Sequence, residues 1–280
     1  MSTLIVGCGY LGRRVGRVLA DRGERVFGTT RSASKAGELS ALGIEPVIAD
    51  VLDPGSLARL PTADRVLACV GYDRAGGVPM RTVYVDGLRQ VIERIVGASR
   101  LVYASATSVY GQNDGGWVDE SSPTVPTTES GRVCLEAEQV ARRLGAERGL
   151  AVNVVRFSGL YGPGRLPSRG GLVRGEPVPG DPERYLNLIQ IDDAATATVA
   201  ALDRGIPGRG YLISDDRPIH RREYYELVAR LLNAPTPRFE ATAASQELPN
   251  KRVSNRRMRE ELGVVLAYPD ITSGVPASLA

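Results

Sequence analysis

The sequence predicts an α/β protein built on a Rossmann-like, doubly wound parallel sheet with a smaller C-terminal substrate lobe. In the first 157 residues, short and nearly continuous apolar runs alternate with helical patterns, and a strand that helices cover on both faces is apolar throughout. Such alternation requires right-handed crossovers, which return the chain in the same direction and give a parallel sheet. After about Phe157 the alternation ends and Gly/Pro-rich segments follow.

The expected strands are residues 3–6, 25–28, 46–49, 65–70, 101–104 and 152–157. The expected helices between them are residues 11–21, 33–42, 54–60, 78–96 and 129–148. We therefore assign residues 1–157 to a dinucleotide-binding domain and residues 158–280 to a substrate lobe, some of whose strands can return to the first sheet. Within this lobe, the glycines and prolines of 159–164 and 170–180 predict loops over a cleft, and 193–203, 210–213 and 222–232 predict a helix, a strand and a helix.

The composition limits the function classes. A chain of 280 residues with 42% hydrophobic content can bury a large core, and its net charge of +3 is too small and too dispersed to predict a nucleic-acid partner. Three distant cysteines, no secretory signal and no membrane span predict a cytoplasmic protein, either a monomer or a homodimer. The single histidine, His220, excludes a multi-histidine metal site and lies in a segment typical of a polar helix start, so we expect no metal.

The N-terminus carries a phosphate-binding turn in the order strand, G-x-G-x-x-G, helix. Gly7 permits the tight exit from the strand, Gly9 lets the backbone approach a pyrophosphate, and Gly12 lets the helix pack on the sheet. Tyr10 and Leu11 open the helix, whose first amides and partial positive charge favour an anion. The alternative interpretation is that these glycines only form a tight turn.

The end of the second strand indicates which dinucleotide binds. A free 2′-hydroxyl needs a carboxylate there, whereas a 2′-phosphate needs cationic and hydroxyl donors. This position holds Thr30, Arg31 and Ser32 with no acidic residue, which favours NADP over NAD, unless Arg31 is simply a surface arginine. The rest of the expected cofactor set consists of Asp50 and Val51 at the adenine, Val70 and Gly71 at the ribose, and Ser105 after the fifth strand.

Several segments carry a family resemblance over nearly the whole chain. They are the glycine turn, Ala104-Ser-Ala-Thr-Ser-Val-Tyr-Gly111, Arg156-Phe-Ser-Gly-Leu-Tyr-Gly-Pro163, Leu188-Ile-Gln-Ile-Asp-Asp193 and Asn250-Lys-Arg-Val-Ser-Asn255. Together they resemble the extended or atypical short-chain dehydrogenases/reductases of the NAD-dependent epimerase/dehydratase-like superfamily, which act mainly on sugar nucleotides. The glycine turn is one residue shorter than is usual in the extended members.

The catalytic set implied by this resemblance is missing. The family uses a tyrosine acid/base, a lysine four residues later that lowers the pKa of the phenol, and a Ser or Thr that polarises the same substrate oxygen. Here Ser130 stands at the tyrosine position, Cys134 at the lysine position and Ala106 at the Ser/Thr position. No tyrosine is followed by lysine at the fourth position, and the chain has only two lysines, Lys35 and Lys251.

The candidate substitutes are hydroxyl groups. We expect Ser105 or Thr107, which flank Ala106, to supply the polarising hydroxyl, and we consider Ser130 and Tyr161 as the acid; Tyr72 and Tyr110 are more typical of structural residues. Dehydratases carry an Asp-Glu pair where this chain has Thr107 and Ser108. Four arginines could give countercharge to an anionic, sugar-nucleotide-like substrate, or could simply be solvated: Arg165, Arg169, Arg174 and Arg184. The basic run 251–259 is interpreted as a structural loop and a solvated helix face.

Two main hypotheses follow. The first is an NADP-dependent oxidoreductase or epimerase-like enzyme with a rearranged catalytic set that acts on a sugar-nucleotide-like or other hydroxylated metabolite. The second is a non-catalytic NADP-binding redox sensor or scaffold, which the missing tyrosine and lysine favour. Unrelated chemistry on the same fold is a third alternative, because a fold does not fix a function.

Overall fold

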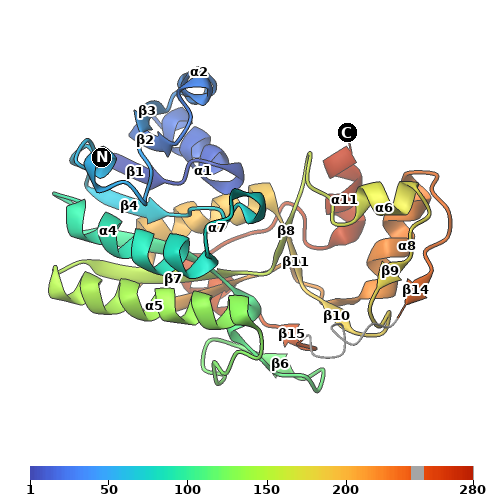
Figure 1. Cartoon of the computed structure of the whole chain (residues 1–280). Coiled ribbons are helices and arrows are strands. Elements are labelled where there is room, and N and C mark those ends of the chain that lie inside the picture. The colour runs from blue at the N-terminus through green and yellow to red at the C-terminus, as the bar shows by residue number, and fades with distance from the viewer. Residues whose placement is uncertain (241–248, 280) are drawn as a thin grey trace.

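The computed structural model describes residues 1–240 and 249–279. Its centre is a seven-stranded sheet in the order β12-β7-β5-β4-β1-β2-β3, and every neighbouring pair is parallel (Figure 1). The strands are β1 (Ser2–Val6), β2 (Arg25–Thr30), β3 (Glu45–Ile48), β4 (Arg65–Ala68), β5 (Arg100–Ala106), β7 (Ala151–Phe157) and β12 (Gly210–Ile213). The predicted doubly wound α/β fold is confirmed.

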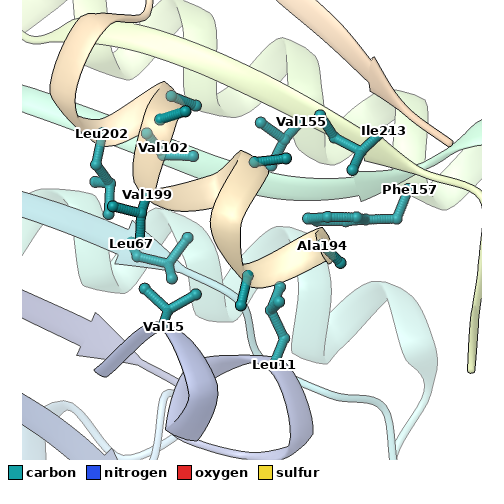
Figure 2. Packing of buried hydrophobic residues seen from close by; sticks show 14 of the residues in the cluster. Leu11, Val15, Leu67, Val102, Val155, Phe157, Ala194, Val199, Leu202 and Ile213 are labelled. Atoms are coloured by element: carbon teal, nitrogen blue, oxygen red, sulfur yellow. The ribbon is translucent and has the colours of Figure 1, made fainter. Parts of the chain in front are cut away.

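Helices cover both faces of this sheet. On one face α1 (Tyr10–Asp21) packs against α7 (Ile191–Arg204), and α10 (Arg256–Leu262) joins them. Figure 2 shows Leu11 and Val15 of α1 facing Val199 of α7, with sheet residues such as Leu67 packed between them. On the other face lie α4 (Gly87–Arg94) and α5 (Glu129–Glu147). The nearly continuous apolar strands in the sequence reflect this double cover.

Three of the expected helices differ from prediction. The helix expected at 78–96 begins at Met80, passes through a π-helical turn (Thr82–Asp86) into α4 and ends at Arg94. Pro79 opposes an earlier start because it disfavours helical geometry in the residue before it. The helix expected at 33–42 is a 3-10 turn (Ala33–Lys35) followed by the short α2 (Ala36–Ser40). The helix expected at 54–60 is the single turn α3 (Pro54–Leu57).

The smaller lobe is built from helices and short strand pairs, on the right of Figure 1. Its helices are α6 (Arg169–Val173), α8 (Arg221–Leu231) and α11 (Ile271–Leu279). Its strand pairs are β8 (Gly159–Tyr161) with β11 (Leu188–Gln190), β9 (Val178–Pro179) with β14 (Phe239–Glu240), and β10 (Tyr185–Leu186) with β13 (Ile219–His220). As predicted, His220 caps a helix, α8, where its main-chain amide donates to Glu223.

The second half of the chain is not confined to the smaller lobe, because α7, β12 and α10 pack on the seven-stranded sheet. Near the junction of the two parts, β6 (Trp117–Val118) pairs with β15 (Arg252–Val253), although the two segments are far apart in the sequence. None of the helices within 1–240 and 249–279 is long and apolar enough to cross a membrane.

Candidate dinucleotide and substrate site

The glycine turn between β1 and α1 has the geometry that its sequence requires. Gly7 has φ +92°, and a Cβ there would lie 2.6 Å from Cα of Val70, so no other residue fits without displacement of the backbone. A Cβ on Gly12 would lie 2.8 Å from the carbonyl oxygen of Gly7, which shows how closely α1 packs on the turn. Because Gly7 and Gly12 have no side chains, the end of β1 and the start of α1 can pack closely against the neighbouring backbone.

The N-terminus of α1 suits an anion. Gly9 is the N-cap residue and offers no side-chain cap, and the first turn of α1 contains no acidic residue. Within the described residues, and apart from Gly9 and its chain neighbours, no atom lies within 4 Å of the place where a Cβ of residue 9 would be, so a ligand could approach this backbone closely. Uncapped amides and the helix dipole favour a phosphate group at this point, so the local geometry fits the diphosphate of a dinucleotide.

A hollow of about 270 Å³ lies in front of this turn, at the carboxyl ends of β1 to β4; we call it the first hollow. Eight of the residues expected to bind the cofactor line it: Gly7, Gly9, Thr30, Arg31, Asp50, Val51, Val70 and Gly71. In open α/β sheets ligands bind at this edge. The chemistry of these residues, backbone amides and small side chains around a basic tip, fits a dinucleotide.

Other expected residues lie behind or beside the first hollow. The hydroxyl of Tyr10 donates to the carbonyl of Pro163 over 3.1 Å, the side chain of Leu11 is in the core, and the hydroxyl of Ser32 is 2.7 Å from that of Ser34. These three side chains make contacts within the protein and do not line the first hollow. Only the main-chain atoms of these residues remain candidates for contact with a ligand.

Two cations that the sequence analysis did not single out also line the first hollow. Arg13 lies in the first turn of α1 and pairs with Glu38 at 2.7 Å, yet its Nε is buried without a hydrogen-bond partner among the described residues. Lys35 ends the 3-10 turn that follows β2. The signal for Arg13 was its place directly after the third glycine. Arg31 is 66% exposed and lies 4.0 Å from Asp73.

Cys8 also borders the first hollow, and its environment makes it unreactive. Burial raises the pKa of its thiol to about 12, so the thiol stays protonated at neutral pH. Burial raises the pKa of Cys134 as well, and its side chain packs with Val109 and Leu212. Cys134 is a small buried residue whose thiol keeps its proton, so it is unsuited to replace a catalytic lysine.

A second hollow of about 300 Å³ lies between the sheet and the smaller lobe. It is lined by Thr107, Ser108, Thr128, Ser130, Gly180, Asp181, Arg184, Tyr185, Leu186, Arg221, Pro249 and Lys251. The structure thus brings together two of the expected catalytic residues, Thr107 after β5 and Ser130 in the first turn of α5. Because β5 neighbours β4, whose end reaches the first hollow, the two hollows open at adjacent strand ends.

Ser105 is a correction. It is buried on β5 and donates a hydrogen bond of 2.6 Å to Glu138 of α5. The same carboxylate accepts two hydrogen bonds from Arg156 of β7, which also donates to the hydroxyl of Tyr110. This buried network ties β5, β7 and α5 together, and Ser105 lines neither hollow. Its expected roles in catalysis and cofactor binding do not fit the structure.

Tyr161 is a second correction. It is 0% exposed inside the smaller lobe, packed in the cluster that contains Leu172 and Val275, and lines neither hollow. Its hydroxyl has no hydrogen-bond partner among the described residues. Burial and the nearby carboxylate of Asp215 raise its pKa far above the usual value for a phenol. A group that holds its proton so tightly, out of reach of a ligand, is unsuited to act as the acid.

Lys251 is the group that the sequence analysis misjudged most. The basic run it begins suggested solvated side chains, yet Lys251 is only 7% exposed and its Nζ donates to the carbonyl of Tyr110 over 2.8 Å. Burial lowers its pKa from 10.5 to about 8. Of the four arginines proposed as countercharge, only Arg184 lines the second hollow, and Arg174 instead pairs with Glu176 at 2.6 Å.

The sheet, the glycine turn and the hollow in front of it define a Rossmann protein of the nucleotide-binding class. Residues 3–214 match the NAD dependent epimerase/dehydratase family. The chain belongs to this family, as the resemblance in its motifs implied.

Known proteins are similar along the full length. Protein YeeZ of Escherichia coli K12 is 32% identical over 277 residues, which cover 95% of this chain and 96% of that protein. The 3-diazoavenalumate denitrifying reductase of a Streptomyces species is 27% identical over 306 residues, with 98% and 99% covered. The crystal structure of DesIV, a dTDP-glucose 4,6-dehydratase from Streptomyces venezuelae with NAD and TYD bound, shares the fold, with a TM-score of 0.86 at 22% identity and 100% and 96% covered.

Proposed function

We propose that this protein binds NADP(H) in the first hollow and is an oxidoreductase or epimerase-like enzyme for an anionic, hydroxylated or carbonyl metabolite held in the second hollow. The observation that carries the proposal is the adjacency of the two hollows, which open beyond the ends of the neighbouring strands β4 and β5. A dinucleotide that lies along the sheet edge from the glycine turn would extend toward the second hollow. Its nicotinamide supplies a hydride acceptor or donor when it is bound.

The choice of NADP over NAD rests on the charges around the end of β2. Thr30, Arg31 and Lys35 line the first hollow there, and no carboxylate lies on that strand end. Asp50 lies one strand away, after β3. Two cations and a hydroxyl suit a 2′-phosphate, because hydrogen bonds to charged groups are the stronger ones. NAD-bound relatives such as DesIV make NAD the alternative.

The substrate class rests on the charges of the second hollow. Among the described residues, Arg184, Arg221 and Lys251 line it against one carboxylate, that of Asp181. Nε of Arg221 is buried and has no hydrogen-bond partner within the described residues, so it is an unused donor next to the hollow. Related proteins act on a sugar nucleotide in one case and on a diazo compound in another, which supports small organic anions as a class without fixing one.

The experiment is a binding titration followed by turnover. NADPH and NADH are titrated by calorimetry against the wild type, against Arg31→Ala and against Arg143→Ala, a control on the exposed surface of α5. Loss of the Arg31 charge should weaken NADPH by about tenfold or more and NADH much less, since such hydrogen bonds contribute about 1.5–3 kcal/mol. An equal loss for both coenzymes would refute the NADP assignment, and no affinity for either would refute the proposal.

A redox sensor or scaffold is the second candidate. It is favoured by Ser130 and Cys134, which stand where the family has its tyrosine and lysine. The absorbance of NADPH is followed with a panel of anionic aldehydes and ketones. Tight NADPH binding without oxidation of NADPH by any of them would favour the sensor over the enzyme.

A further inference from the structure

We propose that Lys251 is the proton donor and acceptor of the reaction, in place of the missing tyrosine. The inference rests on the proposed function, since it needs a substrate carbonyl or hydroxyl in the second hollow. It assigns a catalytic role to a residue from the C-terminal part of the chain, whereas the missing tyrosine and lysine belong to α5.

The position of Lys251 carries the first step. Its side chain lines the second hollow together with Ser130 and Thr107, the residues at the start of α5 and the end of β5. Its Nζ donates to the carbonyl of Tyr110, directly after the 3-10 turn (Thr107–Val109) that ends β5. The ammonium is therefore anchored to the segment that follows β5, the strand after which Thr107 lines the second hollow.

The hydrogen bonding of Lys251 carries the second step. An ammonium group has three N–H donors, and the contact with Tyr110 uses one of them. Within 1–240 and 249–279 no carboxylate lies in ion-pair distance of Nζ. Among the described residues Lys251 is thus a buried ammonium with donors left over and no counter-ion, which is suited to meet a polar group of a ligand.

Burial favours proton release from Lys251. Burial lowers the pKa of Lys251 to about 8, close to the pH at which an acid/base group is most effective. Within the described residues, the other ionisable groups that line the second hollow are Asp181, Arg184, Tyr185 and Arg221. Two of these four are cations, and Asp181 is exposed.

The other hydroxyl groups of the second hollow are weaker acids in this setting. Ser130 lies 3.3 Å from the hydroxyl of Thr128, and in the described residues its hydroxyl makes no hydrogen bond to a basic group. An aliphatic hydroxyl without a base gives up its proton only far above neutral pH. The ring of Tyr185 stacks on His220 with centroids 4.6 Å apart, and the guanidinium of Arg252 lies 5.1 Å from its centroid. Tyr185 also carries an ionisable hydroxyl in the second hollow, so an experiment must distinguish its role in proton transfer from that of Lys251.

The chemistry balances as a carbonyl reduction. The carbonyl carbon gains a hydride from the reduced nicotinamide, the C=O π pair moves onto oxygen, and that oxygen takes a proton from the Lys251 ammonium. The products are an alcohol, the oxidised dinucleotide and a neutral amine that regains a proton from water. In the oxidation direction the neutral amine accepts the hydroxyl proton.

The first test needs neither cofactor nor substrate. Trace acylation of the native protein from pH 6 to 11, followed by peptide mass spectrometry, gives the titration of each amine, with the exposed Lys35 as the internal reference. Lys251 should titrate with a midpoint near pH 8, below the ordinary lysine value of 10.5. Titration of Lys251 near pH 10.5 would overturn the proposal.

The second test uses kinetics with four variants, for each of which NADPH affinity is measured separately. Lys251→Met should lower kcat by about 100-fold or more and leave NADPH affinity within about threefold, because acid/base groups contribute about that much. Lys251→Arg keeps the charge but has no proton to give near neutral pH, so it should be equally slow. Tyr185→Phe should lower kcat much less than Lys251→Met does, and the surface control Arg143→Met should stay within about threefold of the wild-type kcat.

The outcomes separate the two proposals. In the wild type the rate of reduction should fall above about pH 8, as the ammonium loses its proton. A wild-type rate in Lys251→Arg would show that Lys251 contributes only its positive charge. Loss of turnover in Tyr185→Phe alone would show that the phenol of Tyr185 is the proton donor. Either result overturns the inference. NADPH binding without turnover on any carbonyl also overturns it. No binding of NADPH or NADH refutes the proposed function itself, whatever the titration of Lys251 shows.

Discussion

Replacing Lys251 by methionine should change how the stability of the protein depends on pH. In the folded state the pKa of Lys251 is about 8, against 10.5 for an ordinary lysine. Between these two values the unfolded chain binds more protons than the folded one, so the free energy of unfolding of the wild type should rise with pH through this window. At about 1.4 kcal/mol per pKa unit the rise amounts to about 3 kcal/mol.

Methionine keeps most of the length of the lysine and removes the charge, so Lys251→Met should lose this rise. At pH 7 the variant escapes the cost of a buried ammonium but leaves the carbonyl of Tyr110 without its hydrogen bond, which costs about 1–3 kcal/mol. The two effects oppose each other at neutral pH. The difference between wild type and variant across the pH range is therefore the informative quantity, not its value at one pH.

The assay is urea unfolding of both proteins at intervals from pH 7 to 10.5, with the exposed Lys35→Met as the matched control. The wild type should gain about 3 kcal/mol relative to Lys251→Met over this range. A difference between wild type and Lys251→Met that is constant with pH would show that Lys251 titrates alike in the folded and unfolded states, and the reasoning from its burial would be wrong.

Three further predictions concern other parts of the molecule. Glu138→Gln should lower the free energy of unfolding by about 3–5 kcal/mol in urea, because it leaves Arg156 buried without a counter-charge; a loss below 1 kcal/mol would contradict this. Gly7→Ala should destabilise the protein by more than about 1 kcal/mol and abolish NADPH binding in calorimetry, because its Cβ would displace the backbone at Val70. Cys8 should resist iodoacetamide at pH 8 until the protein is unfolded, as mass spectrometry of the alkylated peptide would show.

The sheet could be predicted from the sequence because its signals are local. Each central strand is a short apolar run, and the geometry of the turn is indicated by three glycines, Gly7, Gly9 and Gly12. Helix ends were less certain, as the region 78–96 shows, because packing and a single proline decide where such a helix begins. The residues at the strand ends of β1 to β4 could be named for the same reason: in a parallel sheet these ends meet at one edge.

The second hollow could be predicted only in part, because its members depend on contacts between distant segments. Ser105 and Thr107 are two residues apart on either side of Ala106, and only the position of Glu138 on α5 decides that Ser105 is used inside the protein. Tyr161 follows a strand-like segment in a Gly/Pro-rich loop, but the helices of the smaller lobe bury it. Lys251 stands in a run of arginines, and the fold brings it to Tyr110, 141 positions earlier in the chain.

A proton donor on a loosely held surface loop would be positioned less accurately than one on a long helix. The main chain of Lys251, however, is held by its neighbours on both sides. Its successor Arg252 begins β15, which pairs with β6 beside the junction of the two parts of the protein (Figure 1). Its predecessor Asn250 donates its amide to Gln112 and accepts from the amide of Gly115. The main chain around Lys251 is thus fixed to the segment that follows β5, the same strand whose end forms the second hollow. This arrangement gives Lys251 the support that a catalytic group requires, and its position depends on β5 rather than on the smaller lobe alone.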